Sequence, residues 1–451
     1  MHDAVAGGRA VSESNDRTAM IGLSIIAAVM VVLTLATVPA TRAGGDYAYV
    51  LLALIAGLLA LLATRIAERA PTAHAMWVII GVAIALRLAL LLTEPLLSTD
   101  VYRYVWDGNV QAAGINPYRY VPADDALTHL RDTVVYPNIN RADYAVTIYP
   151  PVAQMFFFLA SRLGENVTTM KAALVACEAV TAGTIALLLK RLGLPATRLV
   201  AYLWHPLPLW QIANSGHVDA LMVALMMLGL WLAVIGWPLR AAVAIALGAL
   251  VKPFAILALP AAWRAWDWKV PLVVLAVMGV CYAPYLSVGS GVFGYLSAGY
   301  LREERFETGG DIWLLAVWRQ IAGVLPGDAY VYFVLAALLV AAMGLRTSLR
   351  TSRSPDMMVA DISGIILTFL FLLSPNYPWY FLIATPFVAL TGGAPVWTLT
   401  IGAVLLQDET RLGFFVPLLL RKHVIYGVFV CTCAYTAWAR RRAGCHAEEI
   451  R

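Results

Sequence analysis

Apolar runs of 14 to 23 residues recur along this chain, and the longer ones are near the ~20 residues that a helix needs to cross a lipid bilayer. Lipid offers the backbone no hydrogen-bond partners, so runs of this length predict membrane-spanning helices. We therefore expect an all-α polytopic membrane protein with about twelve transmembrane helices. The runs are 20–40, 47–64, 76–93, 170–190, 196–212, 216–235, 240–262, 270–288, 329–345, 358–374, 378–391, 394–407 and 424–438.

The composition agrees with a membrane protein and excludes other classes. Of 451 residues, 61% are hydrophobic and 13% are charged, which is about half the charged fraction of a soluble domain. The net charge of +5 includes no long basic run, so nucleic acid is not an expected partner. The five cysteines have neither metal-ligand nor disulfide spacing. We expect no metal and no cofactor.

Basic residues between the runs predict the orientation of the chain. Residues 1–19 carry acidic as well as basic side chains, unlike a cleavable signal sequence, so the first run is expected to be a retained anchor. Arg65 and Arg69 separate the second and third runs and mark a cytoplasmic connection. A single transmembrane domain, 20–440, would then lie between cytoplasmic tails at 1–19 and 441–451.

Two long polar segments fall on the opposite, outer side in this topology. The first outer loop, 94–148, is too long for a simple connection and indicates function. The second outer loop is 289–325. The run 149–163 is short and begins with two prolines, and counting it as a span would leave the basic pair after 170–190 outside. We interpret 149–163 as a helix on the outer membrane surface.

A lysine interrupts the apolar run 240–262. Lys252-Pro253 lies at its centre, and the twelve residues before it would rise only ~18 Å, too little to cross ~30 Å of hydrocarbon. Proline also breaks the helix. We therefore predict a re-entrant hairpin that turns at Lys252. Snorkelling to an interface is the structural alternative, but a buried cation can also bind an anionic headgroup such as a phosphate.

Asp100 follows the third run, where that helix would leave the hydrocarbon on the outer side. An ionisable residue at the edge of a span indicates a functional site. Ser98, Thr99 and Asp100 are also good helix-capping residues, and the two interpretations are compatible. Arg103 and Asp107 have the spacing of a salt-bridged helix face, for which a structural role is favoured.

Further polar residues lie in or near the runs. His217 and Asp219 are two residues apart at a predicted outer turn, too few ligands for a closed metal site. Asp219 could cap the following helix, and His217 could contact an acceptor or support another residue. Arg87 and Glu178 lie inside spans and are expected to pair. Sugar-facing and interfacial roles both remain open for His205, Gln211, Asn376, Tyr377 and Tyr380.

The order and sidedness of several short motifs resemble the GT-C membrane glycosyltransferases, and most of all glycosyltransferase family 87. Relatives in that family include polyprenyl-phosphate-mannose-dependent mannosyltransferases. Two extra spans before Asp100 depart from the better-known members of the family. The motifs are Asp100 after an early span, Tyr149-Pro150-Pro151 after the first outer loop, His217-Val218-Asp219, Val251-Lys252-Pro253 and Ser374-Pro375-Asn376-Tyr377-Pro378.

The resemblance implies a GT-C-like helical bundle and an inverting glycosyl transfer. A sugar, expected to be mannose, would move from a polyprenyl-phosphate carrier to a lipid or glycan acceptor. The site would face the periplasm or cell exterior from a bacterial inner membrane. Asp100 would be the catalytic base. The donor phosphate would be bound by Lys252, Arg302 and Arg305, and the sugar or acceptor by His217, Asp219, Tyr149, Asn376 and Tyr377.

A lipid or solute transporter is the main alternative. Buried Arg87, Glu178 and Lys252 and a proline-broken hairpin also occur in transporters, whose binding sites form where helices are discontinuous. The chain shows no internal repeat joining its halves, and the large first outer loop suits an enzyme better. A purely structural membrane scaffold would leave Lys252 unexplained.

Overall fold

The computed structural model describes residues 2–69, 72–408 and 416–449. Within these ranges every regular element is helical and no strand occurs. The prediction of an all-α polytopic membrane protein is confirmed. Seven helices in the described residues are long and apolar enough to cross a membrane, namely Arg17–Arg69, Ala73–Leu91, Val167–Arg191, Lys269–Phe293, Asp328–Leu349, Pro355–Leu373 and Leu418–Arg442.

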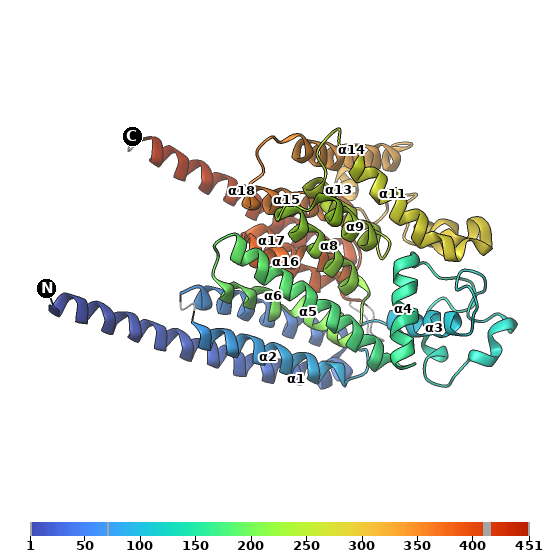
Figure 1. Ribbon diagram of the computed structural model, residues 1–451, viewed down its shortest axis with the longest axis horizontal. Coiled ribbons are helices and arrows are strands. Elements are labelled where there is room, and N and C mark those ends of the chain that lie inside the picture. Colours follow the sequence, from blue (N-terminus) through green and yellow to red (C-terminus); the bar gives the residue numbers. More distant parts are fainter. Residues whose placement is uncertain (1, 70–71, 409–415, 450–451) are drawn as a thin grey trace.

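The first two predicted spans are the two arms of one broken helix. α1 runs from His2 to Arg69, but Gly45 inside it has non-helical dihedrals, φ 62° and ψ −150°. A positive φ of this kind is readily adopted by glycine. Figure 1 shows the chain turning there, so that the second arm runs back beside the first.

Two basic side chains, one from each helix, join α2 (Ala73–Leu91) to α5 (Val167–Arg191). Arg87 forms the predicted buried pair with Glu178, with nitrogen–oxygen distances of 2.6 and 3.1 Å. Lys171 Nζ donates to three carbonyl oxygens at the end of α2, those of Leu90, Leu91 and Thr93, at 2.7–3.2 Å. The Leu90 carbonyl also accepts from the Thr93 N–H at 3.1 Å. Carbonyls at a helix C-terminus lack their full set of intrahelical partners, so Lys171 caps α2.

The predicted continuous span 196–212 is wrong. The chain forms a 3-10 turn (Ala196–Leu199), two short helices, α6 (Val200–Leu203) and α7 (Pro206–Pro208), and a π-helical turn (Leu209–Asn214). The break falls at His205, whose Nδ1 accepts from the Leu207 N–H at 3.1 Å and caps α7. Proline at 206 and 208 removes backbone donors there. α8 (Asp219–Val234) follows.

The helix break predicted at Lys252 is confirmed. α9 (Pro238–Ala249) precedes it, Lys252 itself is extended (φ −144°, ψ 137°), and a 3-10 turn (Pro253–Ala258) leads into α10 (Leu259–Ala262). The two arms of the hairpin approach closely. A Cβ added to Gly248 in the first arm would lie 3.0 Å from the Ala255 Cβ in the second. The tip reaches α4, where the Val152 N–H donates to the Leu250 carbonyl at 3.1 Å.

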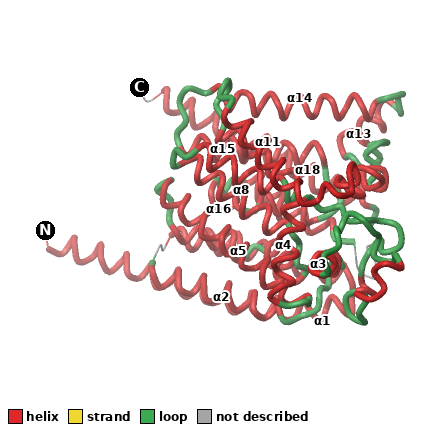
Figure 2. Tube along the Cα trace, turned by 45° about the vertical axis from the view of Figure 1, so that its right-hand side comes forward, coloured by secondary structure: helices red, strands yellow, loops and turns green. Residues whose placement is uncertain are grey.

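Two helices at one end of the molecule frame the first outer loop. α3 (Asp100–Ala112) and α4 (Pro151–Leu163) pack on each other, and α4 lies across the direction of the long helices (Figure 1). Between them the chain is mostly loop, with 3-10 turns at Asp125–Leu130 and Tyr136–Asn138. Figure 2 shows these loops gathered around α3 and α4.

The second half of the chain alternates long helices with short ones. Where the structure describes the chain, five shorter apolar helices occur, namely Asp219–Val234, Pro238–Ala249, Pro253–Ala262, Pro378–Leu390 and Ala394–Leu406. The predicted count of about twelve spans exceeds seven because several apolar runs form these short or broken pieces, and because two predicted spans count as the single helix Arg17–Arg69. The remaining elements are α11 (Lys269–Tyr282) with a 3-10 continuation (Ala283–Phe293), a π-helical turn (Leu296–Tyr300), α12 (Leu301–Glu303), α13 (Trp313–Ala322), α14 (Asp328–Leu349), α15 (Pro355–Leu373), a 3-10 turn (Pro378–Ala384), α16 (Pro386–Leu390), α17 (Ala394–Gly402), a 3-10 turn (Ala403–Leu406) and α18 (Leu418–Glu449).

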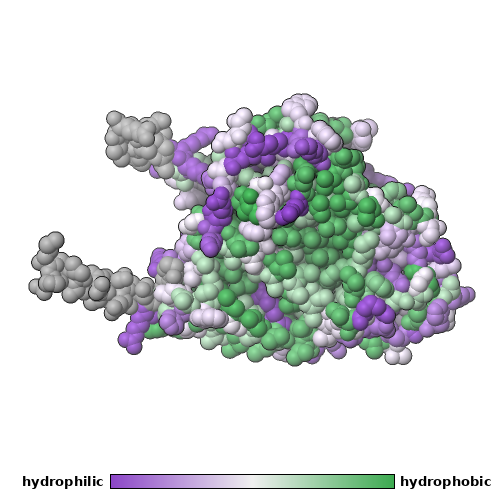
Figure 3. Space-filling view, in the orientation of Figure 1, coloured by the Kyte–Doolittle hydropathy of each residue, from purple (hydrophilic) through white to green (hydrophobic). Residues whose placement is uncertain are grey.

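The surface agrees with a membrane environment. Hydrophobic residues dominate the middle of the face in Figure 3, and hydrophilic residues gather toward its ends. α14 carries Leu335, Leu338 and Leu339 exposed on its outside. An apolar surface this extensive is unusual on a soluble monomer, and it is what lipid contact requires.

Candidate active site

A cavity of about 730 Å³ opens between the N-terminus of α3, the tip of the 238–262 hairpin and the second outer loop. Six of the nine predicted site residues line it, and they come from parts of the chain far apart in sequence. Those six are Asp100, Tyr149, Lys252, Arg305, Asn376 and Tyr377, and the other polar lining residues include Asn140, Arg141, Tyr144, Tyr300, Glu303, Glu304, Asp311 and Tyr380.

Asp100 is the first residue of α3, and its carboxylate does not cap the helix. Thr99 is the N-cap residue and its side chain makes no capping bond, whereas the Ser98 hydroxyl accepts from the Asp100 N–H at 3.3 Å. Asp100 Oδ1 accepts from Asn140 Nδ2 at 2.7 Å, and Oδ2 lies 3.8 Å from His217 Nδ1. The Asp100 side chain is 18% exposed and lines the cavity. The carboxylate is thus held by Asn140, lies near His217, and has access to the open space.

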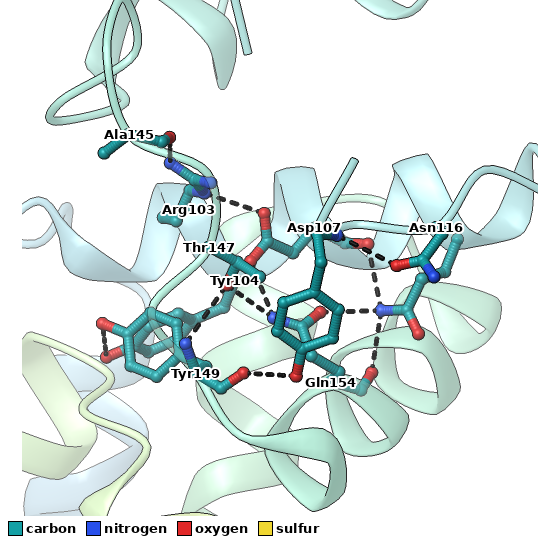
Figure 4. Close-up of polar contacts among 10 residues, drawn as sticks. Arg103, Tyr104, Asp107, Asn116, Ala145, Thr147, Tyr149 and Gln154 are labelled. Atoms are coloured by element: carbon teal, nitrogen blue, oxygen red, sulfur yellow. Dashed lines mark hydrogen bonds and ion pairs between the residues drawn. The ribbon is translucent and has the colours of Figure 1, made fainter. Parts of the chain in front are cut away.

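A buried polar network fixes α3 against α4 (Figure 4). Arg103 pairs with Asp107 at 2.8 Å and donates to the Ala145 carbonyl, so the structural interpretation of this pair is confirmed. Gln154 of α4 donates to Asp107 Oδ2 at 2.9 Å and to the Thr147 hydroxyl at 2.7 Å. Such satisfied buried networks rigidify the structure around them. The network therefore holds the helix that presents Asp100.

Glycine is required where these two helices touch. A Cβ added to Gly108 of α3 would lie 2.4 Å from the Phe157 carbonyl oxygen of α4.

Tyr149, just before α4, packs edge-on against Tyr104 and places its hydroxyl 3.4 Å from the Tyr104 hydroxyl. Burial, with a smaller contribution from Asp100, raises the pKa of Tyr149 well above its ordinary value. Its hydroxyl is therefore neutral.

Lys252 faces the cavity with a carboxylate behind it. Its Nζ lies 2.6 Å from Asp219 Oδ2 and 5.2 Å from the centre of the Tyr380 ring. The Lys252 side chain is 14% exposed and that of Asp219 is 1% exposed. Asp219 Oδ1 has no hydrogen-bond partner among the described residues. Asp219 therefore neutralises Lys252 from within the protein and does not line the cavity.

His217 is enclosed behind Asp100. Its ring stacks on Trp379 with centroids 4.2 Å apart, and the residue is fully buried. Neither ring nitrogen has a hydrogen-bond partner among the described residues. His217 therefore contacts the residues that form the cavity wall, and Trp379 separates its ring face from the open space.

Arg302 and Arg305 of the second outer loop lie on different surfaces. Arg305 lines the cavity, but Arg302 does not. Arg302 lies 3.4 Å from Glu307, has a 76% exposed side chain, and borders a separate hollow beside α14. Between these arginines in the sequence, Glu304 interacts with Asn376 and Tyr300. Burial raises the pKa of Glu304 above its ordinary value, although Arg141 opposes that shift.

Sequence reasoning missed four residues that shape the cavity. Asn140 binds Asp100, and Arg141 pairs with Glu303 at 2.8 Å. Tyr300 places its hydroxyl 2.9 Å from that of Tyr380. Lys422 of α18 donates to the Asp311 and Ser374 carbonyls and to Asn376 Oδ1. Only Lys422 had a usable signal, since it is a lysine at the edge of an apolar run, as Lys252 is within one.

The fold and cavity define a polytopic membrane protein with a polar site held among its helices. Residues 17–268 match the family described as alpha-(1→6)-mannopyranosyltransferase, N-terminal domain. The match covers more than half of the chain, which therefore belongs to this mannosyltransferase family. The resemblance to family 87 is confirmed, and the chain is a glycosyltransferase. No curated protein and no solved structure matches the chain.

The residues matched by the family model include one side of the cavity and leave out the other. Asp100, Asn140, Arg141, His217, Asp219 and Lys252 all fall within residues 17–268. The wall formed by the second outer loop and by 373–380 falls outside it. The family relation thus covers the proposed base and its neighbours, and the structure adds the opposite wall.

Proposed function

We propose that this protein transfers mannose from a polyprenyl-phosphate carrier to a hydroxyl group of a lipid or glycan acceptor. Family membership supports mannose as the sugar. The observation that carries the proposal is the shared cavity, which has the Asp100 carboxylate and the Lys252 ammonium in its lining. A base for the acceptor and a cation for the carrier phosphate are the two charges that such a transfer needs.

The chemistry is an inverting displacement. Asp100 accepts the proton of the acceptor hydroxyl as that oxygen attacks the anomeric carbon of the sugar. The bond from this carbon to the phosphate oxygen breaks on the opposite face, and its electron pair leaves with the polyprenyl phosphate. Lys252 stabilises the departing negative charge. A phosphate leaves without a proton donor, so one carboxylate is sufficient.

The other lining residues supply contacts for the sugar and the carrier. Tyr149, Asn376 and Tyr377 line the cavity, and Arg305 adds a cation on the second outer loop. In this proposal His217 and Asp219 act from behind, on Asp100 and Lys252 respectively. Arg302 is left out, because it lies outside the cavity.

We infer that the cavity faces the periplasm or cell exterior from a bacterial inner membrane, within a GT-C-like bundle of about twelve crossings. Both termini lie at the end of the molecule opposite α3 and α4 (Figure 1). At a connection between spans, Arg198 pairs with Glu68 at 3.3 Å, in the region of the basic residues that predict the cytoplasmic side. The outer loops 94–148 and 289–325 carry cavity residues, which supports one functional face.

Asp100→Asn is the decisive variant. We expect transfer from radiolabelled polyprenyl-phosphate mannose in membranes to fall by roughly 10²–10⁴-fold, because a general base is lost. Asp125→Asn is the matched control, since Asp125 is an exposed carboxylate on the same loop. Its transfer rate should stay unchanged.

Two outcomes would contradict the proposal. Near-normal turnover by Asp100→Asn would remove the assigned base. Efficient transfer from a nucleotide sugar, offered in place of the lipid-linked donor, would remove the assigned donor class.

A further inference from the structure

Two cations of the cavity are joined by a pair of tyrosines. The hydroxyls of Tyr300 and Tyr380 lie 2.9 Å apart. The Arg141 guanidinium lies 5.7 Å from the centre of the Tyr300 ring, and Lys252 Nζ lies 5.2 Å from that of the Tyr380 ring. All four residues line the cavity. Arg141 and Lys252 therefore flank the same stretch of wall, although they come from the first outer loop and the 238–262 hairpin.

Each of these cations already has a carboxylate partner, but the two partners differ in their access to water. Asp219 is 2.6 Å from Lys252 with a 1% exposed side chain, and Glu303 is 2.8 Å from Arg141 with a 33% exposed side chain. Separating Asp219 from Lys252 would leave an uncompensated charge inside the protein, which is strongly unfavourable. Glu303 can be hydrated when it leaves Arg141, so its separation is far less costly.

We propose that Arg141 binds the phosphodiester of the lipid-linked donor, and that Glu303 occupies the Arg141 guanidinium until the donor displaces it. The inference rests on the proposed function, and it names a donor-binding residue and a competing carboxylate. A guanidinium binds phosphate oxygens through two parallel N–H donors. An anion also stays beside Arg141 throughout the exchange, so its guanidinium is never left without a counter-charge.

The turn that carries Arg141 also carries the partner of Asp100. Arg141 has a left-handed backbone conformation, φ 56°, which few residues other than glycine adopt. Asn140, one residue earlier, donates to Asp100 Oδ1, and Arg141 pairs with Glu303. Movement of Arg141 from Glu303 to a phosphate therefore acts on the same turn that orients the proposed base.

Equilibrium binding of a radiolabelled polyprenyl-phosphate mannose to the full chain in lipid nanodiscs tests the exchange. Glu303→Gln removes the competitor, so donor affinity should rise by roughly three- to tenfold. Arg141→Gln removes the ligand, so affinity should fall by roughly tenfold. In the Arg141→Gln background, Glu303→Gln should produce no further gain.

The direction of the change in donor affinity distinguishes this proposal from a purely structural contact between the two outer loops. If the Arg141–Glu303 pair only fastened the two outer loops together, both single variants would break it and both would weaken donor binding. Weaker binding by Glu303→Gln would therefore overturn the proposal. Glu307→Gln is the matched control, because Glu307 pairs with Arg302 on the same loop but outside the cavity, and it should leave donor affinity unchanged.

Two further measurements distinguish a failure of the proposed Arg141–Glu303 exchange from a failure of the proposed function. Binding of the unphosphorylated polyprenol should respond to neither variant, since the phosphodiester is the group in competition. Equal responses with polyprenol would overturn the role of Arg141. If the wild-type chain bound no lipid-linked donor, the proposed function itself would fail. If it bound donor and Asp100→Asn lost transfer while Glu303→Gln weakened binding, only the exchange would fail.

Discussion

The pairs Arg87–Glu178 and Lys252–Asp219 both lie inside the helical bundle, but they differ in how many of their polar atoms have hydrogen-bond partners. Arg87 binds Glu178 through two nitrogens and also donates to the Ala83 and Leu203 carbonyls. Lys252 binds Asp219 through a single oxygen. The other Asp219 oxygen has no partner among the described residues, and Lys252 faces the cavity.

This difference indicates which pair holds the bundle together and which is available for a ligand. Every guanidinium nitrogen of Arg87 and both carboxylate oxygens of Glu178 have a partner, which leaves little capacity to bind a ligand, so this pair joins helices α2 and α5. A pair with unused capacity beside an open space can bind a ligand. A buried charge alone therefore does not identify a binding site. A buried charged pair that has unused hydrogen-bonding capacity and lies beside a cavity does.

The largest effect is expected from Glu178→Gln. Removing this charge leaves the 8% exposed Arg87 side chain without a counter-ion, and breaking a buried pair in this way costs about 3–5 kcal/mol. We expect a clear fall in the thermal unfolding temperature of the detergent-solubilised protein. A variant as stable as the wild type would show that the pair does not fasten α2 to α5.

The matched substitution in the other pair, Asp219→Asn, should cost less stability, about 1–3 kcal/mol. Lys252 faces the cavity, where water can hydrate its ammonium once the carboxylate charge has gone. Mannose transfer should nevertheless fall, because the lysine is no longer held in place. Measuring unfolding and transfer on both variants sharpens the comparison, and equal losses of stability in the two would contradict it.

The smallest effect concerns Glu304, which lies at the cavity rim in the second outer loop. Its raised pKa means that the folded protein favours the neutral carboxyl. This contribution to stability is fully present below the unfolded pKa of about 4.3 and is lost as the pH rises through the folded pKa. Glu304→Gln should therefore be slightly more stable than the wild type at neutral pH. The difference in unfolding temperature should vanish in acid.

Much of the architecture could be predicted because apolar length and charge are local properties of the sequence. The runs at 76–93 and 170–190 correspond to α2 and α5, and the Lys252-Pro253 break occurs where two independent arguments placed it. The span at 196–212 failed because hydropathy does not register the prolines and the histidine cap that divide it. Hydropathy measures transfer into lipid, whereas helix continuity depends on backbone donors.

The cavity could be predicted only in part. Asp100 and Lys252 were detectable because ionisable residues beside apolar sequence are costly and therefore unusual. Asn140 and Arg141 gave no such signal, since polar residues are ordinary in a polar loop. Their importance depends on which distant residues they meet, Asp100 and Glu303, and contacts of that kind follow from tertiary packing.

Lys422 ties the C-terminal helix to the cavity. One ammonium group holds two backbone carbonyls, those of Asp311 and Ser374, and the side chain of Asn376. Two segments, one around Asp311 and one at 374–376, thus converge on a single side chain of α18, and both also border the cavity. A displacement of α18 along its axis, whether by a neighbouring protein or by a change in bilayer thickness, would be transmitted through Lys422 to the groups that meet the substrate.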